Sequence, residues 1–584
     1  MTNGVLGTPF FFMEKLFRYS MIWLGFVLPL AYLAPNHYSP WIAFHQEMLA
    51  GIAFFPLIFL SLINWVRAKE FSLVWWIPLL SAIPFLQMIG GKVIYFSDAL
   101  VPGLYLLGFG LLLCLRNGFL FIKNADDAIE YSTPAFYAII LSGVFSVIFQ
   151  IHQWLNLGWL GVFIVDLKFG ERPYGNLAQP NQLATLLLLG LLSLFCLYGQ
   201  KKISAAPALL IAVLLSFGTA MTQSRAAAIS AVAVSVALVW LMYRKKISAK
   251  TGFKGVLISL SLYCVIFLGW GKINSGLLLS DSLGISYERF NREARLNIWP
   301  LMLDAVGQSP WLGYGWNQVS TAQQEVALDH FSLHLYLESA HNVFIDLMLW
   351  AGLPASVGIT FVFILLLSGG IAKIKTEKEL AVLLMLMVVL VHAFFEYPLS
   401  YSYFLFPVGL LGGVLIESPQ FTVKKAARAY LLFLQRVFFI FSLAGGLAFF
   451  VLVREYFALE ESWRRLQYQS AKIGKEERVA IPKVYLLTGL YELSYMIQLV
   501  PKKEMMSEDI ERSRRVVTRY GWGNLLFKYA LMAGLNGRIQ DSKWALAMVC
   551  KTSSEKYCER AKNSWHELRD EFPGLIDFDS AVRG

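Results

Sequence analysis

Long runs of apolar residues recur through the first 453 residues of this 584-residue chain. A run of about eighteen apolar residues can cross the hydrocarbon core of a bilayer as a helix. Only 15% of the residues are charged, whereas soluble chains carry about a quarter. The sequence therefore predicts an all-α polytopic membrane protein with about thirteen transmembrane helices. The expected spans are 17–34, 47–65, 71–89, 97–115, 134–151, 181–199, 204–220, 226–243, 255–271, 353–372, 379–395, 402–417 and 437–453.

The distribution of basic residues between the loops predicts the orientation. With the N-terminus in the cytoplasm, cytoplasmic segments hold roughly twenty Lys and Arg residues and the longer outer loops hold roughly eight. This bias also explains the net charge of +11 without a nucleic-acid partner. Two large loops, about 152–180 and 272–352, are then periplasmic, and the second ends in an expected amphipathic helix at 342–352.

Charged residues become frequent after about residue 454. We therefore expect a transmembrane domain over 1–453 and a helical periplasmic domain over 454–584. The segment from Tyr529 to Cys550 has the small-residue spacing of a tetratricopeptide-type hairpin, although a plain helical bundle fits equally. A periplasmic location would permit a disulfide between Cys550 and Cys558, and two buried thiols are the alternative.

Polar residues gather at the outer ends of the spans, where they are costly and often functional. The segment from Glu171 to Leu187 contains Asn176, Gln179 and Asn181 at the start of a span. Their amides can bind sugar hydroxyls or phosphate oxygens, although Asn181 could instead cap the helix.

Basic residues form two further groups on the same side. Arg225 lies in a tight turn at the start of the next helix, whose free N–H groups also favour anions. Arg289, Arg292 and Arg295 recur every three residues and would line one helix face. A guanidinium fork suits a diphosphate, whereas lipid headgroups and neighbouring acids are the structural alternatives.

The remaining polar candidates include one histidine suited to proton transfer near neutral pH. His341 precedes the amphipathic helix and could act as a base, with His330 and His334 as competitors in the same loop. Glu396 and Tyr401 lie at the outer ends of the last spans. The one D-x-D pair, Asp577 and Asp579, lies far from these arginines in sequence, so we expect metal-free chemistry without a cofactor.

These motifs resemble those of the bacterial O-antigen ligase superfamily (the Wzy/WaaL type). YGNLAQPNQLATLL is similar to the motif of the PglL-type protein O-oligosaccharyltransferases, which glycosylate pilins. The turn from Thr222 to Arg225, the stretch Arg295–Trp299 and the triplet Ala340–His341–Asn342 look like the ligase core, and EYPLSYSYFL from Glu396 resembles the same subgroup.

The resemblance implies a GT-C-like fold and an undecaprenyl-diphosphate-linked oligosaccharide as donor. It also implies a Ser or Thr acceptor on a periplasmic protein or pilin, at the outer face of the bacterial inner membrane. Arg225 and Arg295 match the family arginines that hold the diphosphate, and His341 matches the essential histidine. The expected reaction is a direct, inverting displacement.

Three other functions stay open at this point. A lipid A-core O-antigen ligase would use the same chemistry with a sugar acceptor, and an O-antigen polymerase would extend a lipid-linked chain. A multi-span transporter or flippase belongs to another class. It should carry charged residues at mid-membrane depth, whereas the expected spans are nearly free of charge at their centres.

Overall fold

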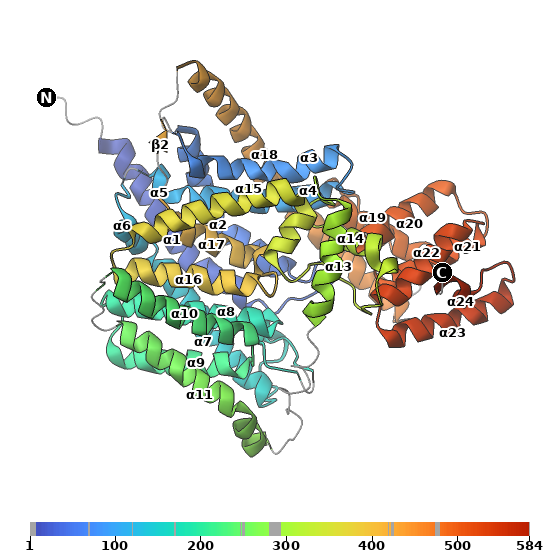
Figure 1. The fold of residues 1–584 in the computed structure, drawn as a ribbon, viewed down its shortest axis with the longest axis horizontal. Coiled ribbons are helices and arrows are strands. Elements are labelled where there is room, and N and C mark those ends of the chain that lie inside the picture. The colour runs from blue at the N-terminus through green and yellow to red at the C-terminus, as the bar shows by residue number, and fades with distance from the viewer. Residues whose placement is uncertain are drawn as a thin grey trace. The chain divides into compact units, whose positions relative to one another are not determined.

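A computed structural model describes residues 7–67, 71–119, 121–168, 171–245, 247, 252–278, 294–417, 420–421, 425–473 and 479–582. Over these residues the regular secondary structure is helical (Figure 1), apart from an antiparallel pair of two-residue strands, β1 (Phe71–Ser72) and β2 (Gln420–Phe421). The chain forms two compact units. The first comprises Met1–Leu80, Tyr105–Asn291 and Phe361–Gly445, and the second comprises Ser81–Leu104, Arg292–Thr360 and Gly446–Gly584.

The first unit is a bundle of apolar helices. Its helices are α1 (Gly7–Leu33), α2 (Phe44–Arg67), α5 (Leu115–Gly118), α6 (Ala125–Tyr131), α7 (Thr133–Trp154), α8 (Pro180–Gly199), α9 (Ala205–Met221), α10 (Arg225–Lys245), α11 (Gly252–Leu278), α16 (Glu377–Ala393) and α17 (Ser402–Leu415). It also holds most of the 3-10 helix η1 (Leu73–Ala82) and parts of α4 (Phe96–Leu113), α15 (Val343–Lys373) and α18 (Lys425–Ser470).

Helix α8 lies at the centre of this unit, packed against α7, α9 and α16 (Figure 1). In its most apolar stretch 89% of the residues are buried, against 11% for α18. Close approach depends on small residues. A Cβ on Gly218 of α9 would lie 2.3 Å from Cγ2 of Val147 on α7. The bundle therefore encloses the start of α8, where the first polar cluster lies.

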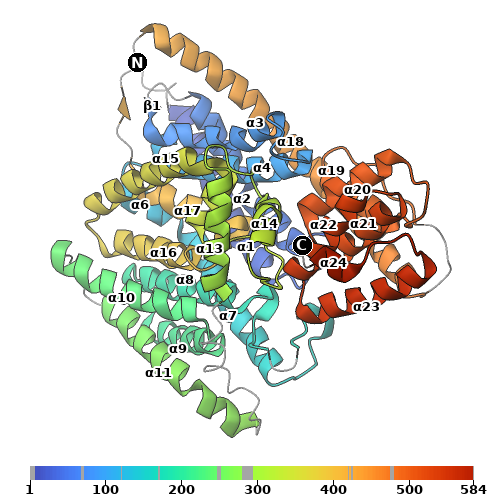
Figure 2. The same ribbon diagram turned by 45° about the vertical axis from the view of Figure 1, so that its right-hand side comes forward.

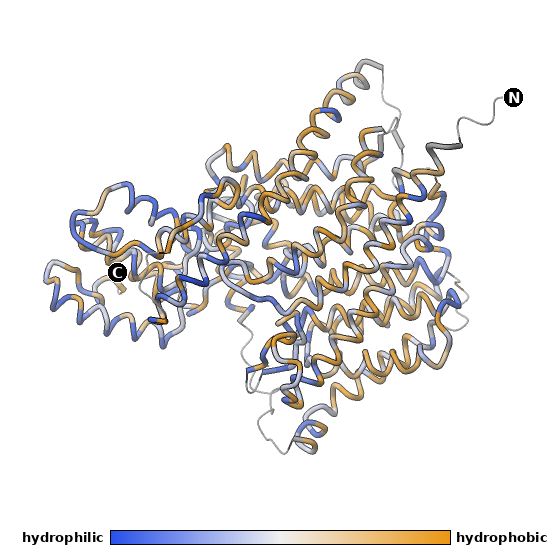
Figure 3. The backbone as a smooth tube through the Cα atoms, turned by 180° about the vertical axis from the view of Figure 1, so that it is seen from behind, coloured by the Kyte–Doolittle hydropathy of each residue, from blue (hydrophilic) through white to orange (hydrophobic). Residues whose placement is uncertain are grey.

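Each expected span overlaps a helical segment of the structure, and the helices are apolar along their length (Figure 3). Within the described residues, nine helices are long and apolar enough to cross a membrane. Three further expected spans correspond to shorter apolar helical stretches. The remaining one corresponds to α16. This helix starts with a capping box, in which the Thr376 hydroxyl accepts from Glu379 N and the Glu379 carboxylate accepts from Thr376 N. The structure confirms a polytopic helical protein, and the count of thirteen stays a prediction.

The second unit joins Ser81–Leu104 and Arg292–Thr360 to the C-terminal helices. Its elements include α3 (Ile83–Ile89), α13 (Ala294–Gln308), α14 (Val319–Val326), the 3-10 helix η5 (Ala327–Asp329), α19 (Thr488–Gln498), α20 (Ser507–Tyr520), α21 (Gly523–Leu535), α22 (Ile539–Thr552), α23 (Glu555–Glu571) and α24 (Phe578–Val582). Packing thus groups Arg292–Thr360 with the C-terminal region, whereas the composition marks a change only near residue 454.

Consecutive C-terminal helices pack against each other, as Figure 2 shows for α19 to α22. In the hairpin of α21 and α22, Ala530, Ala533 and Ala545 are fully buried. The hydroxyl of Ser542 donates to the Ala530 carbonyl at 2.9 Å. The hairpin predicted from small-residue spacing is present, and a tetratricopeptide repeat stays a hypothesis. The predicted disulfide between Cys550 and Cys558 is present and joins α22 to α23.

Helix α15 contains a sharp kink where the amphipathic helix was expected to end. Gly352 has φ of 78°, and a Cβ there would lie 2.3 Å from the Trp311 carbonyl oxygen. Leu353 N donates to the Pro310 carbonyl at 2.7 Å. Only glycine fits this backbone, so the kink is fixed by sequence and separates residues 343–351 from the following apolar stretch.

Candidate active site

A short loop before α8 carries the first polar cluster, and buried glutamines of α7 hold its backbone. Gln153 Oε1 accepts from the N–H groups of Tyr174 and Gly175 at 3.1 and 2.8 Å, and its Nε2 donates to the Gly175 carbonyl at 3.0 Å. Gln150 Nε2 donates to the Pro173 carbonyl at 3.2 Å. The loop around Asn176 is therefore fixed through its main chain.

Asn176 is fully buried, and its side chain is used by the protein itself. Its Nδ2 donates to the carbonyls of Leu33 and Phe163 at 2.7 and 2.8 Å, and its Oδ1 accepts from Val165 N at 3.1 Å. The side chain of Asn176 therefore holds the loop around it, and a contact with the donor stays a prediction.

The carbonyl of Asn176 is held from the other side by the α1–α2 segment. His37 Nε2 lies 2.8 Å from this oxygen, and Gln46 Nε2 donates to it at 3.3 Å. Burial lowers the pKa of the His37 imidazole. The neutral ring is thus favoured beside the loop.

A chain of hydrogen bonds joins three helix ends in the first unit. Ser224 donates its hydroxyl to Asn181 Oδ1 at 2.8 Å, and Asn181 Nδ2 donates to Glu396 Oε1 at 3.2 Å. The prediction that Asn181 could cap α8 is wrong, because the cap is Gln179, whose Oε1 accepts from Gln182 N at 2.7 Å. Pro180 follows directly, so Asn181 already lies within the helix and its side chain points to Glu396.

The turn that carries Arg225 is fastened to the same region. Ser224 accepts from Ala227 N at 3.2 Å and so caps α10. Arg172 donates to the carbonyls of Thr222 and Gln223 at 3.2 and 3.0 Å. Arg225 itself is exposed as the first residue of α10. The turn therefore places Arg225 at the N-terminus of a helix, an end that favours anions.

Aromatic rings line the neighbouring end of α17. Tyr401 lies between Tyr397 and Tyr403, with ring centroids 5.8 and 5.2 Å apart. The Tyr403 hydroxyl donates to Gln182 Oε1 at 2.9 Å, which ties this row of rings to α8. The first unit thus joins Asn181 and Glu396 to the Arg225 turn, and it holds the row of rings that includes Tyr401 against α8.

In the second unit, His341 follows a turn held by Asp346. Asp346 is buried, and its two carboxylate oxygens accept from Ser339 Oγ at 2.6 Å and from Ala340 N at 2.7 Å. His341 N donates to Ser339 Oγ at 2.9 Å. His341 has φ of 55°, which is uncommon for a residue other than glycine. Such strain is often found at functional sites.

The same turn is bonded to the helix that carries Arg295. Trp299 Nε1 donates to the Ala340 carbonyl at 3.1 Å. Arg295 and Trp299 lie one turn apart on α13 and share a face. The second unit therefore brings Arg295 and His341 to one region, whereas Arg225 belongs to the first unit. Arg289 and Arg292 lie outside the described residues.

The two competing histidines have structural partners. His330 Nε2 lies 2.9 Å from Asp304 Oδ2. His334 N donates to the Lys551 carbonyl at 3.2 Å, and its Nδ1 lies 3.2 Å from the Ser553 carbonyl. Both therefore anchor their loop to neighbouring helices, and all three histidines of this segment are partly buried.

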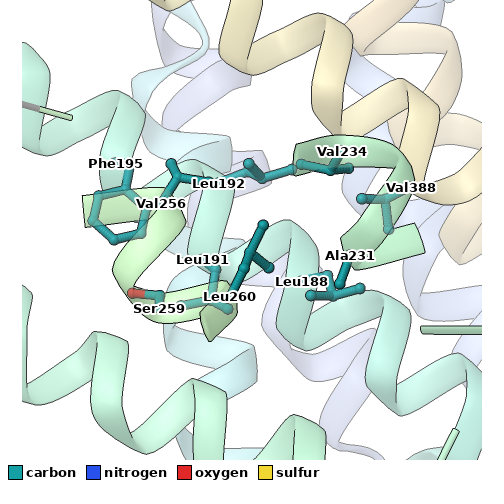
Figure 4. Close-up of a pocket in the computed structure, with 10 residues that line it drawn as sticks. All are labelled: Leu188, Leu191, Leu192, Phe195, Ala231, Val234, Val256, Ser259, Leu260 and Val388. Carbon is teal, nitrogen blue, oxygen red and sulfur yellow. The ribbon is translucent and has the colours of Figure 1, made fainter. Parts of the chain in front are cut away.

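Figure 4 shows a pocket between α8, α10, α11 and α16, away from the polar clusters. Its lining residues are Leu188, Leu191, Leu192, Phe195, Ala231, Val234, Val256, Ser259, Leu260 and Val388. The lining offers no titratable group, so it supplies no acid–base chemistry.

The D-x-D pair of the C-terminal region is used in ion pairs. Asp577 pairs with Arg569 at 2.7 Å, and Asp579 pairs with Lys562 at 2.6 Å.

Three family models match consecutive parts of the chain. The model described as protein glycosylation ligase matches residues 173–197, and the O-antigen ligase model matches residues 210–360. A third, described as the C-terminal part of a virulence factor membrane-bound polymerase, matches residues 380–557. The matches cover the loop before α8, the Arg225 turn, His341 and Glu396.

Two proteins of Acinetobacter baylyi are similar over most of the chain. A general O-oligosaccharyltransferase is 29% identical over 559 residues, which is 94% of each chain. A ComP-specific O-oligosaccharyltransferase is 28% identical over 405 residues, 68% of this chain and 71% of the relative. A polytopic helical bundle with these matched motifs is typical of membrane glycosyltransferases, and the matched models are those of the O-antigen ligase superfamily. Within that superfamily, the chain is similar to the PglL-type protein O-oligosaccharyltransferases.

Proposed function

We propose that this enzyme transfers an oligosaccharide from undecaprenyl diphosphate to Ser or Thr hydroxyls of periplasmic or pilin proteins, at the outer face of the inner membrane. The observation that carries the proposal is the bond from Trp299 to Ala340, which holds the His341 turn against the Arg295-bearing helix. A proton acceptor and a phosphate-binding cation are the two groups that the reaction needs.

In the proposed mechanism, Arg225 and Arg295 bind the diphosphate, together with Arg292. Asn181, Glu396 and Tyr401 position donor or acceptor sugars, while Asn176 and Gln179 hold the loop before α8. The acceptor oxygen attacks the anomeric carbon and its proton passes to His341. The bond from that carbon to the diphosphate oxygen breaks, and the leaving charge is stabilised by the arginines. One such displacement inverts the anomeric carbon and requires neither metal nor cofactor.

Two other reactions of the superfamily stay candidates, each because a family model matches part of the chain. The O-antigen ligase model covers His341 and Arg225, and the polymerase model covers the C-terminal region. Both reactions would use the same donor diphosphate and a sugar hydroxyl as acceptor. The chemistry at His341 would be unchanged, so only the acceptor separates the three functions.

Mass spectrometry of a deletion strain tests the proposal. We expect periplasmic proteins to lose their glycan while lipopolysaccharide keeps its normal chain, and wild-type enzyme to restore the glycan. The His341→Ala variant should be expressed and bind donor but fail to restore it. Normal protein glycosylation with altered lipopolysaccharide in the deletion strain would instead identify a lipid A-core ligase or a polymerase.

A further inference from the structure

The loop that follows α7 exposes a group of apolar side chains. This apolar loop, residues 155–163, has the sequence LNLGWLGVF and contains no charged residue. Leu155, Leu157, Trp159, Val162 and Phe163 are all exposed, and 84% of Val162 is accessible. Contiguous apolar surface of this kind is rarely left to water and marks a contact with a membrane or another protein.

The apolar loop has a defined backbone conformation. Leu157 N donates to the His152 carbonyl at 3.1 Å, and Leu160 N donates to His152 Nε2 at 3.2 Å. The rings of His152 and Trp159 pack edge to face at 5.3 Å. The chain therefore folds back on the end of α7 and presents its apolar side chains outward.

The exposed surface continues a face of α7, which is a candidate membrane span. Tyr137, Leu141, Phe145 and Ile148 are exposed and recur every three or four residues, so they form one stripe of the helix. An exposed apolar stripe on a span faces lipid. Leu155 extends the stripe past the helix end to the apolar loop, at the end of α7 that the basic-residue bias places outside.

We propose that the apolar loop inserts into the outer leaflet of the membrane, with the acyl chains of the lipids as its partner. A protein-binding surface usually has a polar or charged rim, whereas the only polar side chain in this loop is that of Asn156. Aromatic and aliphatic side chains without charges suit the boundary between headgroups and acyl chains.

The inserted loop is also bonded directly to the loop before α8. Asn176 Nδ2 donates to the Phe163 carbonyl at 2.8 Å, and Val165 N donates to Asn176 Oδ1 at 3.1 Å. Gln153 Nε2 donates to the Val165 carbonyl at 2.8 Å. The apolar loop therefore places a lipid-facing surface beside the loop that leads into Asn181, one of the residues proposed to position the donor, and this second inference rests on the proposed function.

Nitroxide labels at three valines test the insertion in proteoliposomes. Cys264, the exposed free cysteine, is first replaced by serine. Single cysteines then replace Val162 in the apolar loop, Val265 in the candidate span of α11, and Val500 between α19 and α20. These side chains are 84%, 69% and 73% exposed, which makes them matched positions.

We expect the Val162→Cys label to collide with oxygen more than with a water-soluble nickel chelate, as the Val265→Cys label should. A Val162→Cys label that behaves like Val500→Cys, with more chelate collisions, would overturn the insertion. Low accessibility to both reagents would overturn it too, since the loop would then be covered by protein. This measurement does not depend on transferase activity.

Kinetics with a lipid-linked donor test the link to the loop before α8. A charge near the membrane interface costs little for stability but should pull the loop toward water. We expect Val162→Asp to raise the KM for the lipid-linked donor roughly fivefold with kcat little changed, and Val500→Asp to change neither. An unchanged KM would overturn the link, while the nitroxide result would still decide the insertion. A wild-type enzyme that transfers nothing would overturn the proposed function instead.

Discussion

The indole N–H of Trp299 donates to the carbonyl of Ala340, the residue immediately before His341, at 3.1 Å. Ala340 is fully buried, and its N–H is bonded to Asp346. Both polar groups of its main chain are therefore satisfied within the second unit. The bond links the helix that carries Arg295 to the turn that carries the proposed base.

Trp299→Phe removes this donor and keeps most of the ring volume. A buried acceptor left without a partner costs about 1–3 kcal/mol, and about 1.4 kcal/mol corresponds to a factor of ten. We expect kcat/KM for transfer to fall roughly tenfold with normal expression. Trp311→Phe is the control, because Trp311 is exposed. Equal activity of the two variants would contradict a role for the bond.

Replacing Arg225 or Arg295 with lysine keeps the charge but removes the planar fork. A lysine binds phosphate as a point charge, whereas a guanidinium makes two parallel bonds. We expect each Lys variant to lose most transfer activity and to bind lipid-linked donor more weakly. Arg560→Lys, in the C-terminal helix α23, serves as the control. Wild-type activity in both site variants would rule out the two-pronged contact.

Asn181→Asp places a second carboxyl against Glu396. The amide of Asn181 now donates to Glu396 Oε1 at 3.2 Å, and a carboxylate cannot donate this bond. Two carboxylates at this distance repel each other, so we expect transfer to fall by roughly a hundredfold at neutral pH. Asn563→Asp, at an exposed position of α23, should leave transfer unchanged. Full activity of Asn181→Asp would show that the hydrogen-bond chain is dispensable.

Serine at both Cys550 and Cys558 should loosen the loop that precedes His341. His334 N donates to the Lys551 carbonyl at 3.2 Å, and the Lys551 ammonium donates to the His330 carbonyl. A disulfide closing a short loop contributes about 2 kcal/mol or more. Hydrogen exchange over residues 330–334 should therefore accelerate roughly tenfold or more, with exchange in α8 unchanged as an internal control. Unchanged exchange at 330–334 would show that the disulfide does not support this anchor.

Lys528 gives the C-terminal helices a specific dependence on pH. Burial lowers its pKa to about 8, from an ordinary value of 10.5. Between these values the unfolded chain binds more protons than the folded protein, so the free energy of unfolding rises with pH. The destabilising effect of burying the charged amine is thus present in full below about pH 8 and disappears toward pH 10.5.

The Lys528→Met variant measures this effect. Its thermal midpoint relative to wild type should be highest at pH 7 and decline steadily as the pH rises from 8 to 10.5. Loss of the bond from Lys528 to the Ile497 carbonyl adds an offset that does not change with pH. Lys556→Met is the exposed control. A difference between variant and wild type that stays constant with pH would contradict the pKa shift.

Signals within a few residues predicted much of this structure. The apolar runs located the helices, and the segment 342–352 corresponds to the first part of α15, up to the kink at Gly352. The sequence left a disulfide and two buried thiols as alternatives for Cys550 and Cys558, and the structure has the disulfide. These features depend on local chemistry, which a sequence displays directly.

Contacts between distant segments could not be predicted in the same way. Gln150 and Gln153 look like ordinary polar residues near the end of a span, and nothing nearby shows that they hold the main chain of residues 173–175. Asp346 lies in a segment expected to form an amphipathic helix, where an acidic side chain is usually exposed to water. The residues near it give no sign that its carboxylate holds the His341 turn. Arg172, too, gave no local sign that it fastens the Arg225 turn.

The hydrogen bonds from Gln153 to the loop before α8 have a consequence for how such an enzyme can diverge. The glutamine binds main-chain atoms of Tyr174, Gly175 and Val165, so these bonds do not depend on which side chains those three positions carry. A substitution at Gln153 itself would remove four hydrogen bonds at once. We therefore expect a lineage to tolerate change at this one glutamine less readily than at the exposed positions of the same region.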